Sequence, residues 1–118
     1  MAEAHPIGPY TPVVRAGDLL FVSGQLGLVD GELVAGGVRE QAAAALANLS
    51  TVLGTAGASL RDVVKATVFL VDMADFEAMN EVYLEAFGDH RPARSSIGVA
   101  ALPRGAVVEI EAVAHRAP

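Results

Sequence analysis

The stretch "PARSSIGVAALPRGAVVEIEAVAHR", Pro92 to Arg116, places Arg94, Glu109 and Glu111 among apolar residues. It predicts two β-strands, about Ser95 to Ala100 and Ala106 to His115, joined by a Pro-Arg-Gly turn. In the second strand two sets of residues alternate: Val108, Ile110, Ala112 and Ala114 against Glu109, Glu111, Val113 and His115. Because successive strand residues point to opposite faces, one face is apolar and the other carries both carboxylates.

The first thirty-odd residues predict further short strands. Tyr10 to Arg15 and Leu19 to Gln25 are rich in β-forming residues, and Ala16-Gly17-Asp18 between them is a hairpin signal. Asp30-Gly31 marks the next turn, and "ELVAGG" adds a short extended piece.

Two stretches have the period of an amphipathic helix. From Val38 to Ala56 a stripe at helical spacing comprises Val38, Ala42, Ala45, Leu46, Leu49, Val52 and Leu53, and Gly57 is suited to follow the helix in a left-handed conformation. After Asp75, a plausible N-cap, the second stripe comprises Phe76, Met79, Tyr83 and Phe87, and Gly88 closes it. Between the helices, Asp62 to Asp72 is dense in β-branched residues and predicts a central strand.

The predicted order is ββαβαββ, which indicates an α+β fold. We expect a single domain spanning residues 1–118, a two-layer sandwich with an antiparallel or mixed sheet and two helices on one face. The opposite face would carry Val107 and Val113 beside the carboxylates. We therefore expect another subunit to cover it.

Composition excludes several functions. The formal net charge is −6 with only eight Lys and Arg residues, which argues against a nucleic-acid partner. The absence of cysteine excludes disulfides and thiolate chemistry. The start "MAEAHPIGPY" lacks the features of a signal peptide, no apolar run is long enough to span a membrane, and we expect a cytoplasmic protein. His5, His90 and His115 lack metal-ligand spacing, so no metal site is expected.

Arg94 and Glu109 are the leading candidates for chemistry. Arg94 follows Pro92-Ala93 in a stiff extended segment, and its guanidinium could bind the carboxylate of a small keto or imino acid; a salt bridge or a solvated arginine is the alternative. Glu109 could hold a water or move a proton if burial raises its pKa. It could equally be a polar face residue, and Glu111 has the same pattern.

The hydroxyls of Tyr10 and Ser23 could donate hydrogen bonds to a ligand, or each could satisfy a backbone carbonyl. Gly24 after Ser23 permits close approach of the backbone. Phe21 occupies the first glycine position of a G-x-S-x-G elbow, which argues against a serine hydrolase, and "GGVREQ" lacks the lysine of a phosphate loop.

Four segments together resemble the RidA/YjgF family of enamine and imine deaminases, in the same order over about Ile7 to Ala114: "IGPYTPVV", "LLFVSGQLG", "VVKATVFLVDMADFEAMNEVY" and "RPARSSIGVAALPRGAVVEIEAVA". The resemblance implies a chorismate-mutase-like fold and a homotrimer with clefts between neighbouring subunits. It also implies hydrolysis of 2-enamino and 2-imino acids, such as 2-aminoacrylate, 2-iminopropanoate and 2-iminobutanoate, to 2-oxo acids and ammonia without a cofactor.

The resemblance also assigns roles to residues. Arg94 of P-A-R-S would bind the substrate carboxylate, and Glu109, the first glutamate of "EIEA", would position the attacking water. Tyr10, Ser23, Gly24 and Ser96 would line the cleft. The chain departs from the family pattern at three positions: Ser96 replaces a common cysteine, Gly98 a frequent glutamate, which would widen the pocket, and Arg91 a common aromatic residue.

Two other functions fit the same scaffold. One is a non-catalytic trimer that captures small carboxylates or acts as a regulatory or chaperone-like partner; it would need Arg94 but not a water-holding Glu109. The other is a ribonuclease, which the acidic charge balance disfavours.

Overall fold

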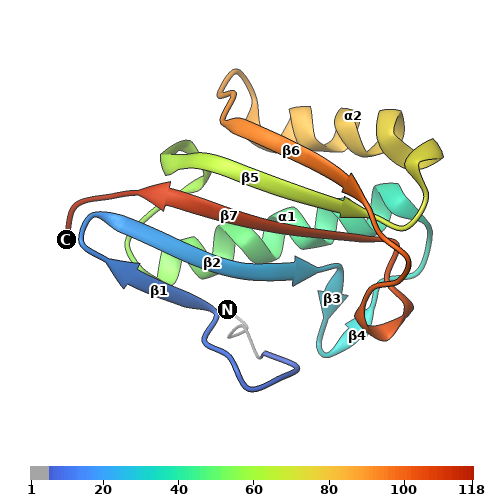
Figure 1. The fold of residues 1–118 in the computed structure, drawn as a ribbon, viewed down its shortest axis with the longest axis horizontal. Coiled ribbons are helices and arrows are strands. Elements are labelled where there is room, and N and C mark those ends of the chain that lie inside the picture. The colour runs from blue at the N-terminus through green and yellow to red at the C-terminus, as the bar shows by residue number, and fades with distance from the viewer. Residues whose placement is uncertain (1–5) are drawn as a thin grey trace.

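A computed structural model describes residues 6–118, so that His5 and the first four residues of the N-terminal stretch lie outside the described part. Figure 1 shows one twisted sheet with both helices on the same face. The five strands lie in the order β1-β2-β7-β5-β6; β5 and β6 are parallel and the other neighbours are antiparallel. The predicted α+β sandwich with a mixed sheet is confirmed.

The strands of this sheet are close to the predicted ranges. Their bounds are β1 Val13–Ala16, β2 Leu19–Leu26, β5 Val63–Leu70, β6 Ala93–Gly98 and β7 Val108–His115. The first strand begins later than predicted, and Tyr10 lies before it, because Pro9 and Pro12 have no N–H to donate to a ladder. Similarly, β6 begins directly after Pro92 and ends where its partner β5 ends, opposite Leu70.

The short extended piece predicted after Gly31 forms a separate small hairpin. β3, Leu28–Val29, pairs with β4, Glu32–Leu33, around the Asp30-Gly31 turn, where both residues have positive φ. The amide Nδ2 of Asn48 on the first helix donates to the carbonyls of Leu26 and Leu28, at 3.0 and 2.8 Å. These bonds join β2 and the hairpin to the helix layer.

The core lies between the sheet and the helices α1, Val38–Thr55, and α2, Phe76–Phe87. The predicted stripe of α1 is buried at every position, as are Met79, Tyr83 and Phe87 of α2. The predicted apolar face of β7 is also buried, at most 4% exposed, and it comprises Val108, Ile110, Ala112 and Ala114. Hydrophobic periodicity therefore predicted the core correctly.

The helix ends agree with the sequence in part. Gly57 follows α1 with φ 79° and Gly88 follows α2 with φ 63°. Asp75 occupies the N-cap position of α2, but its side chain makes no capping bond. The capping carboxylate in this segment is that of Asp72, which accepts a hydrogen bond from the Ala74 N–H at 2.9 Å and caps the short 3₁₀ turn Met73–Asp75.

The sheet face away from the helices is largely exposed among residues 6–118. Val14, Phe21 and Ile97 on this open face are 45–51% exposed. Val107, expected on the same face, instead precedes β7 and packs against the core, because its N–H donates to Gln41 Oε1 of α1. None of the helices within residues 6–118 combines the length and apolar content needed to cross a membrane.

Candidate functional site

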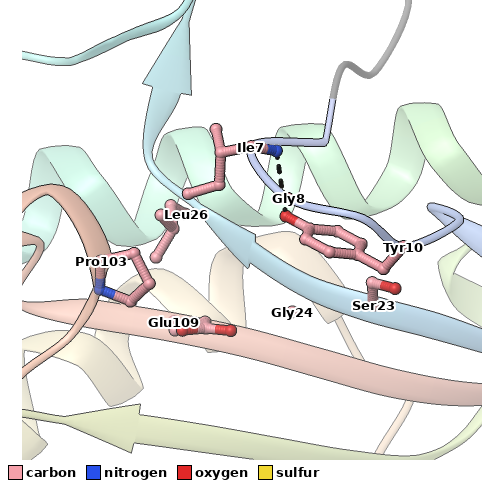
Figure 2. A pocket seen from close by; sticks show the side chains of 8 residues that line it. All are labelled: Ile7, Gly8, Tyr10, Ser23, Gly24, Leu26, Pro103 and Glu109. Atoms are coloured by element: carbon pink, nitrogen blue, oxygen red, sulfur yellow. Dashed lines mark hydrogen bonds between the residues drawn. The ribbon is translucent and has the colours of Figure 1, made fainter.

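A pocket of about 400 Å³ opens on the sheet face opposite the helices, near the ends of β2 and β7 (Figure 2). We call it the glutamate pocket; it is lined by Ile7, Gly8, Tyr10, Ser23, Gly24, Leu26, Pro103 and Glu109. These residues come from the N-terminal loop, β2, the turn before β7, and β7 itself. The volume lies in the range of small-molecule sites.

An irregularity in β2 shapes this pocket. Val22 pairs with Ala112 but Gln25 pairs with Ile110, so β2 has one extra residue at Ser23-Gly24. Such a bulge reverses the alternation of the strand. Leu20 and Val22 therefore belong to the core, whereas Leu26 pairs with Glu109 and lines the pocket.

Gly24 gives the Glu109 side chain its place. A Cβ at position 24 would lie 1.8 Å from Glu109 Oε2 and 2.7 Å from its carboxyl carbon. No side chain larger than hydrogen is compatible with the observed carboxylate position. The role of Gly24 is thus steric.

The structure distinguishes the two glutamates of β7. Glu109 is half-buried in the pocket, and Glu111 is exposed. Burial raises the pKa of the Glu109 carboxyl above its ordinary value, and the nearby charge of Glu111 adds to the increase. A carboxylate with a raised pKa is a better proton acceptor.

The two hydroxyls of the pocket are already engaged in local hydrogen bonds. Ser23 Oγ donates to the Thr11 carbonyl at 2.7 Å, so this hydroxyl satisfies a backbone carbonyl, the second of the two roles considered for it. The Tyr10 hydroxyl oxygen accepts from the Ile7 N–H at 3.3 Å, shown dashed in Figure 2, while the ring is 44% exposed. Ser23 therefore holds the N-terminal loop against β2, and the Tyr10 O–H donates to no acceptor within the described residues.

Arg94 lies in a different environment, which we call the arginine cluster: Arg94, Phe76, Asn80 and Tyr83. Its Nη2 donates to Asn80 Oδ1 at 2.7 Å. The guanidinium carbon lies 4.7 Å from the ring centre of Tyr83 and 5.6 Å from that of Phe76, both within cation–π range. The ion pairs found within residues 6–118 do not include Arg94.

Arg94 and Glu109 are not brought together within one chain. In the parallel pair β5–β6, Arg94 is opposite Ala66, which is buried against the helices, and its side chain contacts α2. Glu109 alternates with the buried Val108 and Ile110, so it points to the open face. The two candidates lie on opposite faces of the sheet.

The three departures from the family pattern have local consequences. Ser96 Oγ is buried, has no hydrogen-bond partner among residues 6–118, and lies on the same face of β6 as Arg94. A Cβ at position 98 would lie 3.2 Å from Met73 Cγ, so Met73 occupies the space beside Gly98. Gly98 does not line the glutamate pocket, so the expected widening is not seen in that pocket. Arg91 donates to the carbonyls of Gly88 and His90 at the end of α2.

Sequence reasoning missed the partners of Arg94. Asn80 and Tyr83 lie four and seven residues after Phe76, on one face of α2. The polar Asn80 within this otherwise apolar stripe was the signal in the sequence that could have indicated a partner for Arg94. Leu26 and Pro103 were missed because only the β2 bulge and the turn before β7 bring them to the pocket. Within the described part of the chain, no cluster of His, Asp and Glu side chains has the arrangement of a metal site.

This protein is therefore a small two-layer α+β domain that presents an arginine and a pocket glutamate on opposite faces of one sheet. A family model described as endoribonuclease L-PSP matches residues 1–116. The chain belongs to this family, which is the RidA/YjgF family indicated by the sequence.

Similar proteins support this assignment. Mouse 2-iminobutanoate/2-iminopropanoate deaminase is 49% identical over 114 residues, which cover 95% of this chain and 84% of the mouse protein. RidA from an Antarctic Psychrobacter has 40% identity and a TM-score of 0.91, covering 94% and 91% of the two chains. Escherichia coli TdcF with bound serine has 41% identity and a TM-score of 0.89, covering 95% and 91%.

Proposed function

We propose that this protein is an imine deaminase that hydrolyses small 2-imino acids to 2-oxo acids and ammonia. Its substrates would be 2-iminobutanoate and 2-iminopropanoate, the latter also formed when 2-aminoacrylate takes up a proton at its methylene carbon. The observation that carries the proposal is Arg94, a half-buried cation without a carboxylate partner among residues 6–118. The name of the mouse relative supports the substrate class.

Arg94 would bind the substrate carboxylate. A guanidinium offers parallel N–H donors that match the two oxygens of a carboxylate, and such charge-assisted pairs are both strong and directional. Only one hydrogen bond to a described residue engages the Arg94 side chain, so donors remain for a ligand. Binding the carboxylate fixes the adjacent C=N carbon in one orientation.

Glu109 would direct the attacking water. Its carboxylate would take one proton as the water oxygen bonds to the imine carbon, and would return this proton to the imine nitrogen to give a carbinolamine. Glu109 would then take the hydroxyl proton as the C=O bond forms and pass it to the nitrogen, so that the C–N bond breaks and ammonia leaves. The raised pKa of Glu109 suits this role in accepting and returning a proton.

The two groups would meet between protomers of a homotrimer. Arg94 and Glu109 lie on opposite faces of the sheet, so a complete site needs Arg94 of one copy beside Glu109 of the next. The exposed Val14, Phe21 and Ile97 offer the open face as the surface to be covered. A head-to-tail contact that closes into a ring gives each site one arginine and one glutamate.

A coupled assay tests the proposal. An amino-acid oxidase generates 2-iminobutanoate, and its conversion to 2-oxobutanoate and ammonia is followed with the parent protein, Arg94→Lys and Glu109→Gln. We expect both variants to lose about a hundredfold or more in kcat/KM, Arg94→Lys by losing the planar pair and Glu109→Gln by losing the base. An inactive parent protein, or unchanged rates in both variants, would overturn it.

A non-catalytic carboxylate-binding role predicts a different pattern. Glu109→Gln would then change nothing, and the parent would bind 2-oxobutanoate without turning over any imine. Ribonuclease activity, suggested by the description of the family model, is disfavoured by the net charge of −6. Cleavage of RNA by the parent protein with loss in Arg94→Lys would favour it.

A further inference from the structure

We infer that Asn80 is a positioning residue that holds Arg94 in place without neutralising its charge, so that the guanidinium stays available to the substrate carboxylate. This inference rests on the proposed function, because it assigns Asn80 to the same site. It concerns how the arginine cluster is built, not only which residue binds the substrate.

The contacts of Arg94 come from one helix. Asn80 Oδ1 accepts from Arg94 Nη2 at 2.7 Å, and the rings of Phe76 and Tyr83 lie against the guanidinium. These three residues are spaced four and three apart on α2, so they form one side of the helix. Tyr83 and Met79 are buried in the core, which fixes this side of α2 relative to the sheet.

The chemistry of the acceptor matters because charged side chains are seldom taken fully out of water unless they are paired. Three exposed arginines pair with a carboxylate, Arg39 with Glu81, Arg61 with Asp89 and Arg116 with Asp62. The exposed Arg15, Arg91 and Arg104 donate to backbone carbonyls. Arg94 has an amide oxygen instead, and the aromatic rings carry no net charge. An amide directs the guanidinium through a hydrogen bond but leaves the full positive charge for an anion.

Replacing this amide by a carboxylate is the sharpest test. Asn80→Asp keeps the size and the acceptor but adds a charge that pairs with Arg94 and competes with the substrate. Asn80→Leu keeps the approximate size and removes the acceptor. Leu84→Glu is the matched control, because Leu84 lies one turn further along α2, is 45% exposed, and gains the same negative charge.

Binding of 2-oxobutanoate, measured by calorimetry, reports on Arg94 without turnover. We expect Asn80→Asp to weaken binding about tenfold or more, Asn80→Leu a few-fold, and Leu84→Glu less than twofold. Urea unfolding should give the reverse order for position 80, with Asn80→Asp at least as stable as the parent and Asn80→Leu less stable. In the imine assay the loss in Asn80→Asp should appear in KM more than in kcat.

If Asn80 has a purely structural role, the two variants at position 80 should rank in the same order in ligand binding and in stability. Asn80→Asp would then be the milder change in both measurements, and this result would overturn the inference. Equal weakening by Leu84→Glu would also overturn it, because the effect would then be a general one of charge. If Asn80→Asp does not fold, Asn80→Glu, which has a longer side chain and the same charge, takes its place, and binding as tight as that of the parent would overturn the inference.

The proposed function and this inference fail in different ways. A parent protein that binds 2-oxobutanoate but does not hydrolyse the imine refutes the deaminase proposal, and the effect of Asn80→Asp on binding still decides the role of Asn80. A parent protein that hydrolyses the imine, with an Asn80→Asp variant that binds and reacts as the parent does, refutes only the role of Asn80.

Discussion

The glutamate pocket and the arginine cluster are built in different ways. The pocket is shaped by the backbone: a bulge in β2 brings Leu26 beside Glu109, and Gly24 leaves room for the carboxylate. The arginine cluster is shaped by side chains, two aromatic rings and one amide on α2. The Glu109 carboxylate is partly removed from water, whereas the Arg94 guanidinium lies against aromatic rings and donates to an amide, with no carboxylate partner in the described part of the chain.

This difference follows from what each group would have to do. A glutamate becomes a useful base when its surroundings raise its pKa, and a closely fitting backbone provides the burial. An arginine remains charged in any surroundings, so its availability depends on which acceptor its neighbours provide.

The largest effect should come from mixing two inactive variants. Co-expressed Arg94→Ala and Glu109→Gln protomers would form some interfaces that join an intact Arg94 to an intact Glu109. In a ring with one site per interface, random mixing restores about one quarter of the parent activity, at least tenfold more than either variant alone. Activity no higher than that of the separate variants would show that the two groups do not act across an interface.

The second experiment separates function from stability in the glutamate pocket. Gly24→Ala displaces the Glu109 carboxylate, and we expect kcat/KM to fall about tenfold to a hundredfold. The free energy of unfolding should change by less than about 1 kcal/mol, because the added methyl group displaces only the end of the flexible Glu109 side chain.

Gly54→Ala is the matched control for Gly24→Ala. Gly54 lies inside α1 with nothing within 4 Å of an added Cβ, so this variant should keep its activity and gain up to about 1 kcal/mol of helix stability. A similar loss of activity in both variants would contradict the steric role of Gly24.

The third experiment uses pH to test the burial of Glu109. The pKa of Glu109 is higher in the folded protein than in the unfolded chain, so folding favours the protonated carboxyl. The protonated carboxyl contributes its full stability below the unfolded pKa of about 4.3. This contribution is lost as the pH rises through the folded pKa. Glu109→Gln should therefore be more stable than the parent at neutral pH, with the advantage declining towards acid pH in urea unfolding.

Glu111→Gln provides the comparison in that pH series. It removes only the smaller contribution to the raised pKa of Glu109, so its gain at neutral pH should be smaller. A stability difference between Glu109→Gln and the parent that does not change with pH would contradict the role of burial.

The smallest effects are expected at the turn before α2. Asp72→Ala removes the cap of the 3₁₀ turn and should cost about 0.5–1 kcal/mol, whereas Asp75→Ala should change thermal unfolding very little. The reverse order would show that Asp75 caps the helix in solution. Neither variant should alter imine turnover at saturating substrate, because neither residue belongs to the pocket or the cluster.

Much of the fold could be predicted because it rests on local patterns. The helical stripes and the alternation in β7 identified the core, and Gly57 and Gly88 marked helix ends. The predicted start of β1 at Tyr10 was wrong because Pro12, inside the predicted range, has no N–H to donate to a ladder. The sequence predicts Asp75 as the cap, whereas Asp72 makes the capping bond, because a 3₁₀ turn without a clear sequence signal lies between the two residues.

The sequence alone is enough to predict the α+β class, the apolar faces and the family, and it indicates Arg94 and Glu109 as candidates. The three-dimensional arrangement shows that Glu109 rather than Glu111 enters a pocket, that Arg94 donates a hydrogen bond to Asn80, and that the two candidates face opposite sides of the sheet. Periodicity assigns a residue only to a face. Which face meets the helices, and which side chains then touch, depends on strand order and on one extra residue in β2.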